Sequence, residues 1–99
     1  MERPRPHETD IRLPLGQVVA TPGALEALEE AEVQPATLLV RHQRGDWGEL
    51  DEDDKRLNDE AVTDEGRILS AYVLPTGVKV WIITEWDRSA TTFLLPSEY

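Results

Sequence analysis

The chain has 99 residues, no cysteine and a formal charge of −10. This length fits one domain, and the lack of cysteine excludes disulfides, thiolate nucleophiles and cysteine-ligated zinc. Its longest apolar stretches are only as long as a strand, so we expect no signal peptide, no membrane span and a cytoplasmic location.

The negative charge is concentrated in the middle of the chain. Residues 45–66 have a net charge of −8, whereas residues 1–44 have −2 and residues 67–99 are neutral. An acidic field repels the phosphates of nucleic acids and attracts basic surfaces. The pattern therefore predicts a protein partner with a basic surface rather than nucleic acid, with solubility as the plainer explanation.

Prolines and alternating charges dominate residues 1–14, which we expect to form a flexible arm before a single domain at residues 15–99. A short strand is predicted at residues 15–20. Thr21-Pro22 is typical of a helix start, because threonine accepts a bond from an unpaired amide and proline suits the first helical position. Apolar residues at helical spacing extend this helix over residues 22–32.

Two further helices are predicted before residue 66. Gln34-Pro35 begins the second helix, and Gly45 ends it. Asp51 fits the N-cap of a third helix, whose first-turn carboxylates interact favourably with the helix dipole. Leu57 and Ala61 are predicted to form the thin apolar side of this third helix.

The last third of the chain has the pattern of strands. Residues 67–74 and 78–86 are predicted to form a hairpin, and a third strand runs from Thr91 to Leu95. The sequence thus predicts an α+β fold. Two to three short helices precede a three-stranded antiparallel meander, to which the N-terminal strand can be added.

The loop lengths predict a register that places Ser70 opposite Ile82 and Thr84 opposite Phe93. Both faces of the resulting sheet are rich in apolar side chains, although a half-solvated sheet should have one polar face. We therefore expect helices on one face, and a partner subunit or the N-terminal strand on the other. A homodimer is one hypothesis that follows.

Two clusters combine side chains capable of chemistry. In the first, His42 suits proton transfer near neutral pH, Arg44 can hold a phosphate or carboxylate, and Asp46 can orient either. The structural alternative is that His42 caps the second helix and Trp47 anchors the core.

The second cluster surrounds the turn at residues 85–92, which contains two carboxylates, a guanidinium and three hydroxyls. Its structural alternative is that Asp87 bonds to nearby amides, as turn residues do, while Arg88 pairs with Asp87 or with the acidic helix. Both interpretations stay open at this point.

The sequence predicts neither a metal nor a cofactor. The carboxylates that begin at Asp51 resemble a calcium loop, but its sixth position is Arg56 and its twelfth is Val62, where glycine and glutamate are needed. Glycine-rich phosphate-binding and G-x-S-x-G motifs are also absent from the sequence.

Several segments resemble a family of small uncharacterised bacterial proteins of plasmids and other mobile elements. They are residues 16–25 (GQVVATPGAL), 45–50 (GDWGEL), 82–89 (IITEWDRS) and 91–99 (TTFLLPSEY). Some members are described as modification subunits of type I restriction enzymes, but a chain of 99 residues without a glycine-rich cofactor turn lacks a methyltransferase domain. The resemblance implies a bacterial cytoplasm and a mobile-element context, and it transfers no catalytic residue.

Two functions from different classes follow. The first is a non-enzymatic interaction protein whose acidic helix engages a basic surface on a nucleic-acid-binding or host-defence protein. Its binding residues are Asp51, Glu52, Asp53, Asp54, Asp59 and Glu60.

The alternative is a small metal-independent ribonuclease of barnase-like or RelE-like architecture, an analogy at the level of fold. Its candidate catalytic residues are His42, Arg44, Arg88, Thr91 and Tyr72. The sequence leaves the enzyme question open and leans towards a non-enzyme.

Overall fold

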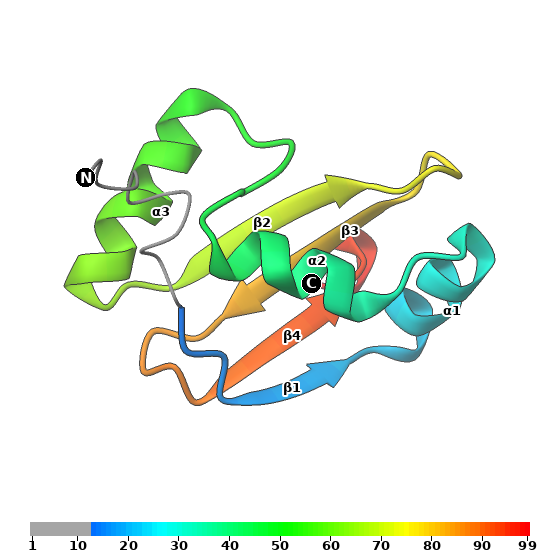
Figure 1. Ribbon diagram of the computed structural model, residues 1–99, viewed down its shortest axis with the longest axis horizontal. Coiled ribbons are helices and arrows are strands. Elements are labelled where there is room, and N and C mark those ends of the chain that lie inside the picture. The colour runs from blue at the N-terminus through cyan, green and yellow to red at the C-terminus, as the bar shows by residue number, and fades with distance from the viewer. Residues whose placement is uncertain (1–12) are drawn as a thin grey trace, which may run out of the picture.

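The computed structural model describes residues 13–99, which form an α+β fold of three helices and one four-stranded sheet (Figure 1). The elements follow in the order β1 (Gln17–Ala20), α1 (Pro22–Ala31), α2 (Pro35–Gln43), α3 (Glu52–Asp64), β2 (Ile68–Val73), β3 (Lys79–Thr84), β4 (Ala90–Leu94) and a short 3₁₀ helix, η2 (Pro96–Glu98). The predicted fold class is therefore confirmed. The predicted arm lies outside the described residues, except for its last two positions.

The sheet is mixed, with strand order β1-β4-β3-β2. Strands β2, β3 and β4 form the predicted antiparallel meander, but β1 adds a fourth strand parallel to β4. All three helices lie between β1 and β2 in the chain and carry it from one edge of the sheet to the other. Helix α2 crosses the sheet, while α1 and α3 lie towards opposite ends (Figure 1).

The predicted register is correct for the first hairpin and wrong for the second. Ser70 lies opposite Ile82 as expected, but Thr84 lies opposite Thr91 rather than Phe93. The turn begins one residue earlier than predicted, because the amide of Glu85 bonds to the carbonyl of Ala90. A shift of two residues keeps each side chain on its predicted face.

The predicted helix starts are confirmed, and the predicted apolar side of the third helix is correct for Ala61, which packs against the core, but wrong for Leu57. The side chains of Thr21 and Asp51 accept bonds from Ala24 N and Asp54 N, as N-caps do. Leu57, however, is 58% exposed, and the buried position of α3 is the polar Asn58.

Most of the buried apolar side chains form two clusters on the helix-covered side of the sheet. The larger cluster includes Leu28 and Leu38 from the helices and Phe93 from β4. The smaller cluster consists of Leu13, Trp47 and Ile68, which confirms that Trp47 anchors the core. Leu13 was assigned to the flexible arm, yet it is buried, and its amide bonds to the carbonyl of Gln43 on α2.

Candidate functional site

Helix α3 is fixed to the rest of the fold by polar contacts as well as by the packing of Ala61 and Val62. The side-chain amide of Asn58 donates to Leu69 O at 2.7 Å and accepts from Leu69 N at 3.2 Å. Trp47 Nε1 donates to Asp59 Oδ1 at 2.9 Å. These bonds satisfy the backbone of β2 and set which side of α3 faces the protein.

Arg88 holds the other end of the same helix. Its guanidinium donates to Gly66 O at 2.6 Å and to Ala61 O at 2.7 Å, and also reaches Glu85 O at 3.2 Å. Ala61 O also accepts bonds from the amides of Glu65 and Gly66, so Arg88 reinforces the end of α3, where a cation suits the negative end of the helix dipole. Arg88 therefore contacts the acidic helix through the helix backbone, and no carboxylate within residues 13–99 forms an ion pair with it.

Asp87 has the local role that its turn position predicts. Its carboxylate accepts a bond from the amide of Ser89 at 3.0 Å. Bonds from Ser89 also lower the pKa of the Asp87 carboxyl. The two neighbours Asp87 and Arg88 thus serve separate structural purposes in one turn.

This anchoring leaves the carboxylates of α3 on the surface. Glu52, Asp53, Asp54 and Glu60 are exposed around the exposed Leu57. Within residues 13–99, the only ion pair that α3 forms joins Asp53 to Arg56 at 3.2 Å, and both side chains are largely exposed. The negative charge of the helix is therefore not neutralised by the described part of the protein.

Two residues of the predicted acidic patch also have structural roles. Asp51 accepts a bond from the amide of Asp54 at 2.8 Å as the N-cap of α3. Asp59 is the acceptor for Trp47. The carboxylates of the patch without such a role are Glu52, Asp54 and Glu60, with Asp53 in its exposed pair.

His42 lies in the interior and does not cap its helix as the structural alternative proposed. Its Nδ1 is 2.5 Å from Ser70 Oγ, and its Nε2 is 2.8 Å from Thr84 Oγ1. The chain of bonds continues from Thr84 to the Thr91 hydroxyl at 2.8 Å, and Thr91 donates to Leu15 O at 2.8 Å. This chain of hydrogen bonds thus links α2 to β2, β3 and β4 and to the segment before β1.

Burial determines the protonation of His42. Loss of solvent, with a smaller effect from the charge of Arg88, lowers the pKa of His42 to about 4. The ring is therefore neutral at pH 7, with one nitrogen donating and the other accepting. Trp47 packs against it edge to face, with 5.8 Å between ring centroids.

The remaining residues of the predicted catalytic set are also placed by the structure. Tyr72 is buried and donates to Asp46 O at 2.6 Å, and burial raises the pKa of its phenol. Arg44 is exposed at the end of α2. Since His42, Thr91 and Tyr72 are enclosed in the core, the five residues do not line a common open cleft.

Sequence reasoning missed Arg41, which organises the surface beside Tyr72. Its guanidinium bonds to both carboxylate oxygens of Asp46, at 2.6 and 3.2 Å, and lies 4.6 Å from the centroid of the Tyr72 ring. The bond from Arg41 lowers the pKa of Asp46. Asp46 is thus a structural partner of Arg41, and only its position near the helix end hinted at this.

Residues 13–99 contain no group of three or more histidine, aspartate or glutamate side chains arranged to hold a metal ion. In the same range, no helix is long and apolar enough to cross a membrane. Comparison of the chain with models of protein families, with curated proteins and with solved structures found no match.

Proposed function

We propose that this protein is a non-enzymatic interaction protein that binds a basic surface of a partner protein through the exposed side of α3. The observation that carries the proposal is that α3 turns its carboxylates outward, where the described residues leave most of them without a basic partner. Of the α3 carboxylates, only Asp53 has a basic partner within residues 13–99, and that pair is itself exposed. Exposed pairs of this kind contribute about 0–1 kcal/mol and compete weakly with a partner's charges.

The position of Leu57 supports binding rather than simple solvation. A leucine that is 58% exposed lies among carboxylates one turn away in both directions, at Asp53, Asp54 and Glu60. Interfaces commonly surround a buried apolar centre with a polar rim. Leu57 would supply the apolar contact, while the carboxylates would steer the approach of a basic partner.

The resemblance to mobile-element proteins suggests the class of partner. Nucleic-acid-binding and host-defence proteins present basic surfaces, and an acidic helix is complementary to them. We therefore propose a partner of this class in a bacterial cytoplasm.

The test compares three immobilised proteins in a bacterial lysate. The first is the wild type. The second has α3 neutralised by Asp51→Asn, Glu52→Gln, Asp53→Asn and Asp54→Asn, in which asparagine keeps an N-cap. The matched control has four exposed glutamates of α1 and its C-cap neutralised: Glu26→Gln, Glu29→Gln, Glu30→Gln and Glu32→Gln.

Both variants change the net charge from −10 to −6, since each loses four carboxylates. We expect the wild type and the α1 variant to retain the same basic protein, with binding weakened by salt. The α3 variant should bind it at least about tenfold more weakly. Equal retention by all three proteins, or by none, would remove the proposal.

A second measurement separates electrostatic attraction by the carboxylates from apolar contact at Leu57. Leu57→Ala leaves every charge in place, and the side chain is outside the core. We expect it to weaken the purified complex about tenfold through faster dissociation, with little change in the salt dependence. An unchanged dissociation rate would exclude Leu57 from the interface.

The ribonuclease hypothesis gains no specific support from the positions of its residues. His42 and Thr91 are fully buried, and both nitrogens of His42 are already bonded. The ribonuclease function stays a prediction. Cleavage of RNA by the purified protein would establish it.

A further inference from the structure

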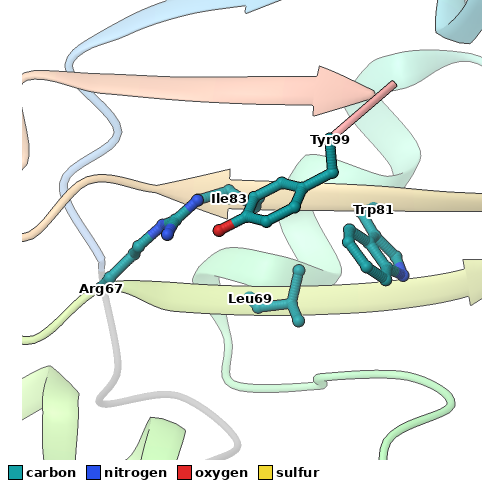
Figure 2. Close-up of a pocket in the computed structure, with 5 residues that line it drawn as sticks. All are labelled: Arg67, Leu69, Trp81, Ile83 and Tyr99. Carbon is teal, nitrogen blue, oxygen red and sulfur yellow. The ribbon is translucent and has the colours of Figure 1, made fainter. Parts of the chain in front are cut away.

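A pocket of about 250 Å³ lies on the side of the sheet opposite the helices (Figure 2). Its floor is formed by Leu69 on β2 and Ile83 on β3. Arg67 and Trp81 stand at opposite ends with Leu69 between them, and Tyr99 reaches over from the segment after η2 (Figure 2). A pocket of this size, at the small end of ligand sites, accommodates a single ring with a short substituent.

The aromatic walls are held at an angle to one another. The rings of Trp81 and Tyr99 have centroids 5.6 Å apart and planes inclined by 70°, an edge-to-face arrangement. The guanidinium carbon of Arg67 is 5.1 Å from the centroid of the Tyr99 ring. A third ring lying on Leu69 would meet an aromatic wall and have a cation at one end.

The charge at this pocket is opposite to that of the rest of the protein. The chain carries −10 overall, yet no carboxylate side chain of residues 13–99 lines the pocket. Glu85 follows the last paired residue of β3 and is the acidic side chain nearest to Arg67 by register, but the described residues contain no ion pair between them. The guanidinium of Arg67 thus offers its donors to an incoming anion.

We propose that this pocket binds a small aromatic carboxylate. The ring would lie on Leu69 against Trp81 and Tyr99, and the carboxylate would accept hydrogen bonds from Arg67. Arginine matches a carboxylate with two parallel donors, which fixes orientation as well as supplying charge.

A free small molecule fits this site better than a peptide segment. Peptides that bind along a sheet need unpaired main-chain groups at an edge. The pocket lies over β2 and β3, and β3 pairs on both sides. The outer edge of β2 is occupied as well, because Ala71 bonds to Trp47 O and Glu49 N. The site therefore offers a peptide only contacts with side chains and no main-chain hydrogen bonds.

This inference is independent of the proposed function, since it concerns another face of the protein and the opposite charge. Neutralising the α3 carboxylates should leave the pocket's binding in place, and loss of the pocket should leave α3 binding in place. The two proposals can therefore fail separately.

The experiment is an NMR titration of the full chain with phenylpropionate and its neutral analogue phenylpropionamide. We expect phenylpropionate to cause saturable shifts of the Trp81 indole N–H, with the amide at least about tenfold weaker. Arg67→Gln should reduce phenylpropionate binding about tenfold and leave the amide unchanged. Arg44→Gln, which removes an exposed guanidinium elsewhere, is the matched control and should change neither.

Equal shifts from the acid and the amide would overturn the proposal, as would saturable shifts at Trp47 or Trp86 without any at Trp81. Unchanged affinity in Arg67→Gln would also overturn it. A short peptide with a C-terminal phenylalanine tests the other source of the same chemistry. If it binds more than about tenfold tighter than phenylpropionate, the assignment to a free small molecule is wrong.

Discussion

The Nε2 atom of His42 on α2 lies 2.8 Å from the hydroxyl oxygen of Thr84 on β3, and both side chains are fully buried. This bond joins the helical layer to the central part of the sheet. Because the ring has no room for solvent, its protonation is coupled to folding. The stability of the protein should therefore depend on pH in a defined range.

We predict that the free energy of unfolding decreases as the pH is lowered from about 6.5 to about 4. The pKa of His42 drops from 6.5 to about 4 on folding, so in this range the unfolded chain binds a proton that the folded protein excludes. The contribution of His42 to this loss should reach about 3 kcal/mol and level off below about pH 4, where protonation of carboxyls with lowered pKa, such as that of Asp46, adds a separate loss. Urea unfolding at a series of pH values measures it, and an equal slope in His42→Gln would contradict this origin.

The bonds of His42 also predict the effect of removing it. His42→Ala should destabilise the protein by about 2–4 kcal/mol at pH 7, because it opens a cavity and takes a partner from Ser70 and Thr84. Denaturant unfolding gives the value. A loss below about 1 kcal/mol would mean that these hydroxyls find other partners.

The substitution Arg88→Asn tests how much the bonds from Arg88 to the end of α3 contribute to stability. Asparagine tolerates the positive φ of 61° at this position, so the substitution removes the bonds to Ala61 O and Gly66 O without adding strain. We expect a loss of about 2 kcal/mol and faster amide exchange in the last turn of α3. The control Arg56→Asn removes only an exposed ion pair and should cost less than about 0.5 kcal/mol.

Two glycines with positive φ should respond differently to alanine. At Gly77 (φ 91°) an added methyl group meets no atom within 4 Å, so Gly77→Ala should cost only backbone strain, about 1–2 kcal/mol. At Gly48 (φ 78°) it would collide with the carbonyl of Ala71 and come within 2.8 Å of the Tyr72 ring. Gly48→Ala should therefore cost at least about 2 kcal/mol more, as thermal unfolding can test.

The local features of this fold could be predicted from sequence because short-range chemistry determines them. Thr21-Pro22 and Asp51 marked the two helix starts that the structure caps with side chains. The loop at residues 75–77 gave the register of β2 against β3. Side-chain faces in the meander followed from the alternation of strands.

The features that were missed depend on contacts between distant residues. Nothing in the local sequence distinguishes Asn58 from its exposed polar neighbours, but it is buried because its amide bonds to the backbone of Leu69 in both directions. His42 resembled a helix cap until the partners from β2 and β3 were known. The pocket was invisible for the same reason, since Tyr99 meets Arg67 and Trp81 only after the sheet has formed.

The parallel pairing of β1 with β4 has a consequence for biosynthesis. Gln17 pairs with Ala90, so β1 cannot pair with β4 until nearly all the described residues have left the ribosome. The helices and the β2–β3 hairpin can form earlier from nearer segments, while Val18 and Val19 stay without their strand partner. Late closure of this long loop should slow folding, and β1 is the segment that a nascent chain would expose to chaperones.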